Sequence, residues 1–329
     1  MSKSLGHIAA AVLLTVLSLL FSCGRKGSPA APAARTRPFL VAEVPGVISS
    51  PSEKLEYRAL HYWNAFADTA SGPWKCDSLT IEGVGADEAD QAMSNFAYLL
   101  GQVSPALAAK ASAAFLDRIS TFQQARPMSN MFSRMTDLAR KYLYDPNSPM
   151  RRECAYHEIA LGLSKSPLTA PEMKEAFARE AFLCSMNAEG SVAADFDFTD
   201  LSGRSRSLHG IKAAFTVLIF GDPDCRSCSE IVSSMRSDPS LMSLVSSGKV
   251  KVADIYIDED VRQWRQKASL YPKEWINGYD HNFILRQNAL YDIRAIPSIY
   301  VLDKDKTVIL KDTTPERLIA FLSSVAKEI

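Results

Sequence analysis

PDCRSC, residues 223–228, lies between two segments with different hydrophobic patterns. The segment before it, FTVLIF at 215–220, is a continuous apolar run of the kind that forms a buried β-strand. The segment after it, SEIVSSM at 229–235, has apolar residues at helical spacing. The two cysteines of the motif, Cys225 and Cys228, are therefore expected where a strand turns into a helix.

This expected position determines the chemistry of both thiols. A helix N-terminus presents unpaired N–H groups and a partial positive charge, which favour thiolate over thiol. We expect Cys225 to be the exposed nucleophile and Cys228, about one helical turn further on, to be the buried thiol that resolves a mixed disulfide. Arg226 adds a positive charge that should stabilise the thiolate further, and Asp224 should partly offset it.

The cysteine pair has two alternative roles. One is a fixed, inert disulfide. The other is a metal site, but zinc takes four ligands and the nearest histidines in sequence, His209 and His281, stand isolated. No metal and no other cofactor is therefore expected.

A second motif lies downstream, in LYDIRAIPSIYVLD at 290–303. Pro297 opens an expected strand there, where proline costs no ladder hydrogen bond, and X–Pro bonds are the ones that adopt the cis form readily. Together with the Cys-x-x-Cys helix start, Ile296-Pro297 resembles the thioredoxin superfamily, most closely the TlpA/ResA-like thiol–disulfide oxidoreductases. The resemblance covers about the last 140 residues, the length of one ordinary domain. It implies that Pro297 is cis, that it packs beside the cysteine pair and that Ile296 and Pro297 line the substrate groove.

The chain departs from that family at positions that handle protons. A buried aspartate usually stands six residues before the first cysteine, and Ile219 holds that place here. A lysine on the next strand aligns with Asp254, so Asp254 or Glu230 is a candidate proton acceptor. A partly exposed strand position is nevertheless the simpler expectation for Asp254. Arg294 is either a groove residue or a solvated surface arginine.

Residues 1–23 are predicted to be a lipoprotein signal peptide. Lys3 gives a positive start, and the apolar run 8–21 is shorter than the roughly 20 residues of a membrane-spanning helix. LFSC at 20–23 resembles a bacterial lipobox, which implies that Cys23 is lipidated. The alternative is an ordinary signal peptide with a chance cysteine. The absence of an aspartate at Gly24 favours the outer membrane, and residues 24–48 are expected to be a flexible tether.

Residues 49–188 show helical periodicity and predict an all-helical domain of five or six helices. Ser-Pro pairs at 104–105 and 148–149 and a capping box at 169–172 mark expected helix starts. Around the turn at 145–149 (DPNSP) this region resembles a domain of unknown function that precedes thioredoxin modules in some bacterial lipoproteins, and the resemblance implies no activity. Its cysteines, Cys76, Cys154 and Cys184, form either one disulfide plus a free thiol or three buried thiols.

The predicted fold class is an N-terminal all-α domain followed, at 189–329, by an α/β thioredoxin-like fold with a central mixed sheet flanked by helices. The predicted function is a membrane-anchored thiol–disulfide oxidoreductase of the bacterial cell envelope, facing the periplasm. It is expected to act on protein disulfides or thiols and to be reset by a redox partner protein. Thiolate stabilisation makes such a pair more oxidising, whereas the resemblance implies a reductase, which we favour.

Two other functions are weighed against this one. In the first, the chain is an envelope scaffold whose helical domain recognises a partner and whose thioredoxin module is not catalytic. In the second, it reduces peroxides, but no Thr-x-x-Cys arrangement precedes Cys225. Nucleic acid is not an expected partner, because 37 basic and 37 acidic residues leave no net charge.

Overall fold

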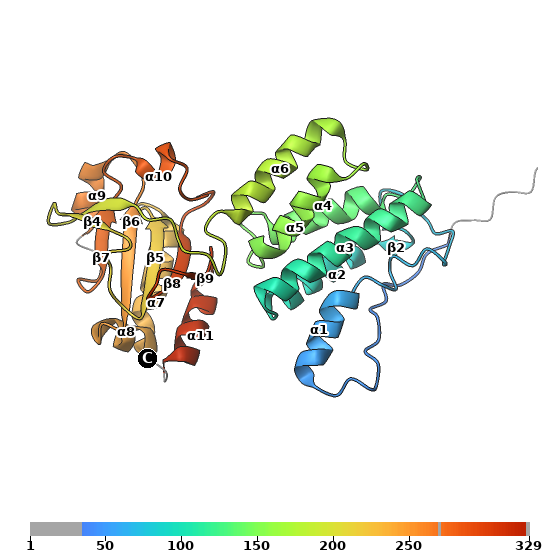
Figure 1. Ribbon diagram of the computed structural model, residues 1–329, viewed down its shortest axis with the longest axis horizontal. Helices are drawn as coiled ribbons and strands as arrows, with labels where there is room; N and C mark the ends of the chain where they lie inside the picture. Colours follow the sequence, from blue (N-terminus) through green and yellow to red (C-terminus); the bar gives the residue numbers. More distant parts are fainter. Residues whose placement is uncertain (1–34, 269–270, 327–329) are drawn as a thin grey trace, which may run out of the picture.

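The computed structural model describes residues 35–268 and 271–326 (Figure 1). The predicted signal peptide, the lipidation site Cys23 and the first part of the tether lie outside these residues. The described chain forms a helical region followed by a sheet-containing module, and a short linker around residues 186–193 joins them (Figure 1). Within the described ranges, no helix is both long enough and apolar enough to cross a membrane.

The helical region packs around one aromatic-rich core, in which Trp63 makes ring contacts with Phe66, Phe96 and Phe115. Helix α3 begins where expected, because the Ser104 hydroxyl accepts a hydrogen bond from the Leu107 amide and proline follows it. The helices of this region are α1 (Pro51–His61), α2 (Ala86–Gly101), α3 (Pro105–Ala125), α4 (Met131–Leu143), α5 (Glu153–Lys165) and α6 (Pro171–Ser185).

Three expectations for this region are wrong in detail. It is not wholly helical, because β1 (Thr80–Ile81) and β2 (Val84–Gly85) form a short hairpin, with Glu82 and Gly83 at positive φ in its two-residue turn. Helix α5 begins at Glu153 rather than Pro149, since the Ser148 hydroxyl stabilises a turn by bonding to the Tyr142 carbonyl. The predicted capping box at 169–172 does not form, because Ala170 is the N-cap of α6.

The sheet-containing module is a seven-stranded mixed sheet in the order β4-β3-β7-β6-β5-β8-β9. Strand β5, in the interior of the sheet, pairs in parallel with β6 and antiparallel with β8. The strands are β3 (Asp197–Asp200), β4 (Ser205–Ser207), β5 (Phe215–Gly221), β6 (Val250–Tyr256), β7 (Ile276–Tyr279), β8 (Ser298–Asp303) and β9 (Val308–Leu310). This confirms the predicted thioredoxin-like fold with a mixed sheet and flanking helices.

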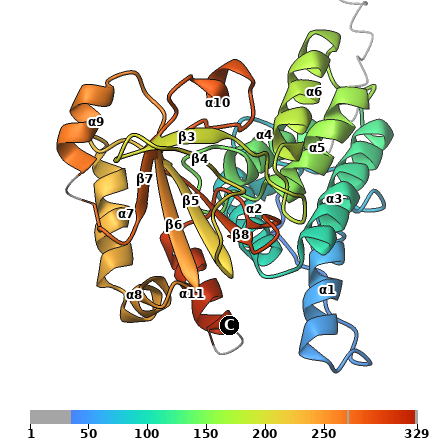
Figure 2. The same ribbon diagram turned by 60° about the vertical axis from the view of Figure 1, so that its left-hand side comes forward.

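Helices lie on both sides of this sheet (Figure 2), and an apolar layer covers each of its faces. Helices α7 (Arg226–Ser237), α8 (Pro239–Ser246) and α11 (Pro315–Val325) pack against one face, where Val217 and Ile219 point. On the other face, Leu218 and Phe220 pack with Tyr291 and Leu285, the latter from the short helix α10 (Ile284–Gln287). The alternation along β5 is that of a central strand buried on both sides.

The segment 258–290 contains a strand that the sequence did not predict. The sequence of this segment predicts one or two helices with a break at Tyr271-Pro272, but α9 (Val261–Lys267) is followed by β7, which pairs with both β6 and β3. The four residues of β7, INGY, carry no alternating pattern of their own. At the opposite edge of the sheet, the linker runs along β9, where the Gly190 amide donates to the Val308 carbonyl and the Val308 amide to the Ser191 carbonyl, each at 2.8 Å.

Candidate functional site

Cys225 and Cys228 lie at the junction of β5 and α7, as the sequence predicts. Cys225 is the N-cap of α7, and its sulfur accepts a hydrogen bond from the Cys228 amide at 3.2 Å. The turn that leads into the helix is stabilised by Asp222, whose carboxylate accepts from the Asp224 amide and whose carbonyl accepts from the Cys225 amide. A sulfur in this position faces the unpaired donors of the helix start.

The two thiols differ in their environments. Both are free; Cys225 is partly exposed, whereas Cys228 is buried with 3% of its surface exposed. Burial, together with the neighbouring Cys225, raises the pKa of the Cys228 thiol well above its usual range. An accessible sulfur at the helix start and a protonated sulfur behind it are the arrangement that the nucleophile and resolving roles require.

The second motif lies next to the first although it is 71 residues away in sequence. The Ile296–Pro297 bond is cis, and the Cys225 thiol donates to the Ile296 carbonyl at 3.8 Å. Within the described part of the chain, the backbone N–H groups of Ala295 and Ile296 have no hydrogen-bond acceptor. An extended chain lying over Cys225 therefore has backbone groups with which to pair.

The charged residues that flank Cys225 have partners of their own. Arg226 is exposed and forms an ion pair with Glu230 at 2.8 Å. Asp224 forms an ion pair with Lys267 and accepts a hydrogen bond from Gln263, both on α9. The expected influence of Arg226 on the Cys225 thiolate therefore stays a prediction. Glu230, the alternative proton acceptor, is an exposed surface carboxylate.

Asp254 is buried behind the cysteine pair, with 7% of its surface exposed. It sits on β6 directly across from Ile219 of β5. A Cβ on Gly221 would stand 3.4 Å from the Asp254 carboxylate and 3.7 Å from the Cys228 sulfur, so these two groups are no more than about 7 Å apart. Burial raises the pKa of Asp254 from an ordinary 3.8 to about 7.

The expectation that Asp254 is partly exposed is therefore wrong, and the sequence held the signal that would have corrected it. Val250, Val252 and Asp254 alternate along β6 and share the face that α7 and α8 cover. Tyr271 was missed altogether. It is half-buried beside the site, and its pKa is raised by burial and, to a lesser degree, by the Asp254 and Cys228 charges.

The remaining cysteines lie away from this site, and all three are free thiols. Cys76, which accepts from the Asn130 amide, and Cys154 are both partly exposed, and only Cys184 is buried. The expectation of three buried thiols is therefore wrong for two of them, and the alternative disulfide is not formed. Burial raises the pKa of Cys154 to about 11 and that of Cys184 further. In the part of the chain that the structure describes, no three His, Cys, Asp or Glu side chains are grouped as metal ligands.

Comparison with known proteins places both regions of the chain. A domain of unknown function, DUF5106, matches residues 22–185, the segment that ends with α6. A thioredoxin-like protein from Bacteroides caccae is 32% identical, with a TM-score of 0.74, over 88% of this chain and 99% of its own, which includes both regions.

Two further solved structures each match less than half of the chain. The C-terminal domain of an uncharacterized protein from Bacteroides fragilis is 36% identical over 42% of this chain and 99% of its own, with a TM-score of 0.41. A domain of a possible thiol-disulfide isomerase from Cytophaga hutchinsonii is 24% identical over 43% of this chain and 94% of its own, with a TM-score of 0.35. Among curated proteins, no similar sequence is found.

Proposed function

Because this chain belongs to the thioredoxin-like proteins, we propose that it is a thiol–disulfide oxidoreductase that exchanges electrons with protein disulfides through Cys225 and Cys228. The observation that carries the proposal is the position of the Cys225 sulfur. It caps a helix, is partly exposed, and faces the Ile296 carbonyl beside cis-Pro297. A non-catalytic scaffold does not require an accessible sulfur, a buried second thiol and unpaired backbone groups to lie together in one place.

The first step is the attack of the Cys225 thiolate on a substrate disulfide. A bond forms between Cys225 and one substrate sulfur, and the other substrate sulfur leaves as a thiolate. In the second step the Cys228 thiol gives up its proton and attacks the Cys225 sulfur. The Cys225–Cys228 disulfide forms, the second substrate thiolate leaves, and the substrate has gained two electrons.

Asp254 is the proton acceptor in the second step. With a pKa of about 7, its carboxylate is partly ionised near neutral pH, so it can both take a proton from Cys228 and return it. Proton transfer proceeds directly or through one water molecule across the gap beside Gly221. Asp254 thus replaces the acid that the family usually carries at the position of Ile219 on the adjacent strand.

The proposed direction is that of a reductase, so two electrons must return to the pair from a redox partner protein after each cycle. We place the protein in the cell envelope, exported by residues 1–23 and attached to the outer membrane by lipid on Cys23. These proposals rest on the apolar run and the LFSC motif. Incorporation of radiolabelled palmitate that Cys23→Ala abolishes is the expected result, and unchanged incorporation excludes this anchor.

A redox titration tests the central proposal. The protein is equilibrated with glutathione buffers of graded potential and alkylated, and the states of Cys225 and Cys228 are read by mass spectrometry. A reversible pair with a low, thioredoxin-like potential supports a reductase, and a high potential indicates an oxidase or isomerase. Cys225→Ser must abolish exchange, whereas Cys76→Ser, in the helical region, must not. If Cys225 and Cys228 do not interconvert between dithiol and disulfide in any buffer, the result favours the alternative function as a non-catalytic scaffold.

A further inference from the structure

The loop that carries cis-Pro297 is attached to the helical region on its N-terminal side. Arg294, three residues before the proline, donates to the Tyr144 carbonyl at 2.7 Å and to the Glu153 carboxylate. Its guanidinium also stacks over the Tyr144 ring, 4.0 Å from the centroid, and pairs with Asp292 of its own loop at 3.0 Å. Arg294 is thus neither a groove residue nor a solvated surface arginine but a buried contact between the two regions.

The same loop is attached on its C-terminal side by a second charged contact. Ser298, which directly follows Pro297, donates its hydroxyl proton to the Asp312 carboxylate. That carboxylate pairs with Arg151 of the helical region at 3.1 Å, and Arg151 also donates to the Asp312 carbonyl at 3.0 Å. The two contacts bracket the cis-proline loop, and their partners, Arg151 and Glu153, stand two residues apart at the start of α5.

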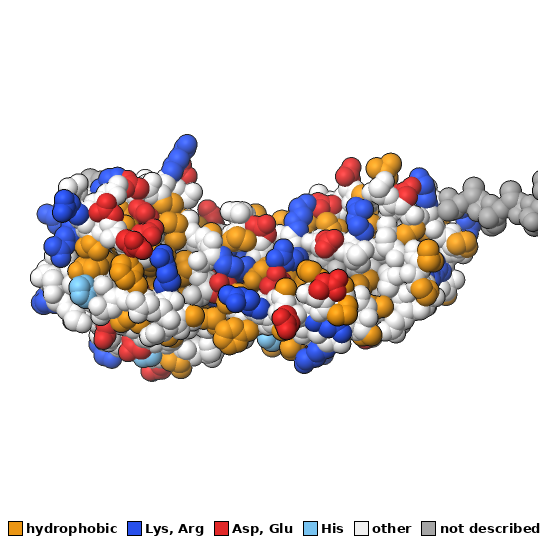
Figure 3. Space-filling model, turned by 90° about the horizontal axis from the view of Figure 1, so that it is seen from above, with side chains coloured by type: hydrophobic (Ala, Val, Ile, Leu, Met, Phe, Trp, Pro, Cys, Tyr) orange, Lys and Arg blue, Asp and Glu red, His pale blue; other side chains and the backbone are white. Residues whose placement is uncertain are grey.

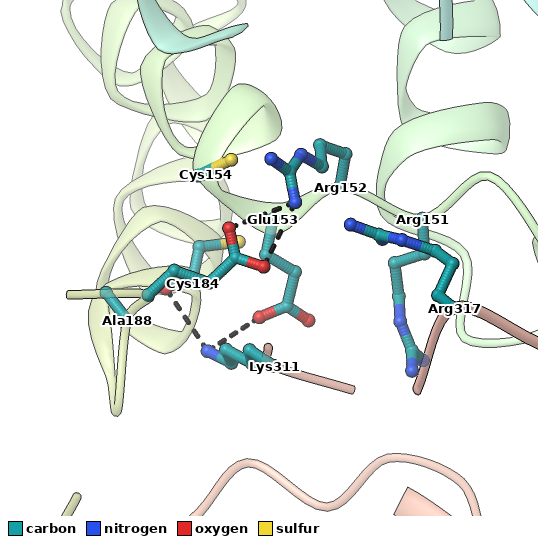
Figure 4. Close-up of a pocket in the computed structure, with 9 residues that line it drawn as sticks. Arg151, Arg152, Glu153, Cys154, Cys184, Ala188, Lys311 and Arg317 are labelled. Atoms are coloured by element: carbon teal, nitrogen blue, oxygen red, sulfur yellow. Dashed lines mark hydrogen bonds and ion pairs between the residues drawn. The ribbon is translucent and has the colours of Figure 1, made fainter. Parts of the chain in front are cut away.

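A buried lysine, Lys311, lies beside Glu153 in this group of charges (Figure 4). Lys311, next to Asp312, pairs with Glu153 at 2.7 Å, and both side chains are 4% exposed. Its ammonium also donates to the Met186 and Cys184 carbonyls at the end of α6, at 2.6 and 3.2 Å. Buried charges that satisfy one another tolerate little displacement, because any gap leaves a charge both unpaired and desolvated.

We propose that the helical region positions the cis-proline loop for the binding of polypeptide substrates, with Arg294 and Arg151 as the positioning residues. The inference rests on the proposed disulfide exchange. The loop supplies the Ile296 carbonyl that faces Cys225 and the free N–H groups with which a substrate backbone pairs. The role of the helical region is therefore to fix one wall of the substrate site in place.

This role predicts different effects on large and small substrates. A disulfide within a peptide needs the loop for backbone pairing, so a loop that shifts by about 1 Å weakens its binding. A small aromatic disulfide reaches the Cys225 sulfur without pairing with the loop. Loss of either the Arg294 contact or the Arg151 contact, which we call the bracket contacts, therefore raises KM for the peptide. The rate with the small disulfide stays unchanged.

The variants are Arg294→Met and Arg151→Met, made in the full chain. Glu153 then keeps Lys311 and Asp312 keeps Ser298. Arg294→Met does leave Asp292 without its ion-pair partner, which is why a lysine variant that keeps the charge is needed beside it. The control is Arg152→Met, which leaves the buried Glu189 carboxylate without its ion-pair partner and so tests whether loss of a buried charge pair at this interface is enough to change KM. Arg152 lies between Arg151 and Glu153 in sequence, but it pairs with Glu189 at 3.0 Å and does not contact the cis-proline loop. Arg294→Lys is the rescue variant, since lysine keeps the charge but not the planar fork or the stacking.

The measurement is the rate of reduction of a disulfide-bonded peptide and of a small aromatic disulfide, with thermal melts as a check of folding. We expect both bracket variants to raise KM for the peptide about tenfold, with partial recovery in Arg294→Lys and no change in Arg152→Met. The rate with the small disulfide should stay within about twofold of that of the unmodified protein.

The outcomes separate this inference from the function on which it rests. An unmodified protein that reduces neither substrate refutes the proposed function itself. An active protein whose bracket variants match Arg152→Met refutes the positioning role, as does an equal loss with both substrates in a variant that melts normally. If Arg294→Met fails to fold, Arg294→Lys and Arg151→Met decide the question by the same comparison.

Discussion

Replacing Asp254 by asparagine removes the buried acid behind the cysteine pair with little change in shape. In the folded protein burial raises the pKa of this carboxyl from 3.8 to about 7. The folded state therefore binds more protons than the unfolded state between these values, and stability falls as the pH rises through this window. A difference of about three pKa units corresponds to about 4 kcal/mol.

Asparagine does not titrate, so the variant does not lose stability through this group as the pH rises. We expect the free energy of unfolding of Asp254→Asn, relative to that of the unmodified protein, to increase by about 4 kcal/mol between about pH 4 and about pH 8. Urea unfolding at the two pH values measures the difference, because all other titrating groups are shared and cancel. Parallel pH profiles would contradict a raised pKa at Asp254.

The same substitution should slow one step of exchange and spare the other. Without an acceptor, the Cys228 thiol loses its proton about a hundredfold more slowly, the lower end of what general bases contribute. The attack by Cys225 does not use Asp254. Single-turnover reactions, quenched with acid and analysed by mass spectrometry, should therefore accumulate the mixed disulfide in Asp254→Asn. Resolution at the normal rate would refute the role of Asp254 even if the stability prediction holds.

Three further predictions follow from residues of the site and the interface. Cys228→Ser should trap a stable mixed disulfide on Cys225, visible as a mass adduct, and no adduct would mean that Cys225 is not the nucleophile. Gly221→Ala should fold normally, because the added Cβ makes ordinary contacts at 3.4 and 3.7 Å, but it should slow resolution by filling the gap between Cys228 and Asp254. Lys311→Met should lower the free energy of unfolding by about 3 kcal/mol in urea titrations, since it leaves buried acceptors unpaired. A loss below about 1 kcal/mol would mean that this group of charges tolerates rearrangement.

The position of the candidate site was predictable because its signals are local. A strand followed by Cys-x-x-Cys and a helix is visible within about twenty residues, and Ile296-Pro297 carries its own backbone constraint. The burial of Asp254 was also accessible through the alternation along β6. It was missed because a charged residue in a strand was assumed to face solvent.

The remaining features depend on partners that are distant in sequence. Arg294 contacts Tyr144 and Glu153, which are 150 and 141 residues away, and no local sequence pattern predicts such a contact. Strand β7 exists because β6 and β3 offer it pairing on both sides, not because its four residues favour a strand. The late start of α5 reflects a turn stabilised by Ser148, a residue that equally suits a helix cap.

The surface charge and the edges of the sheet bear on how this protein would meet other polypeptides if the proposed function holds. On the face seen in Figure 3, basic and acidic side chains are interspersed, including between the two regions. The edge strands, β4 and β9, are three residues each, and the linker occupies the outer side of β9. Because unfolded clients present extended chains, a long free edge would recruit them into aggregates. Under the proposed function, the backbone of Ala295 and Ile296, beside the Cys225 sulfur, is where an extended client chain would pair, whereas β4 is short and β9 is both short and covered.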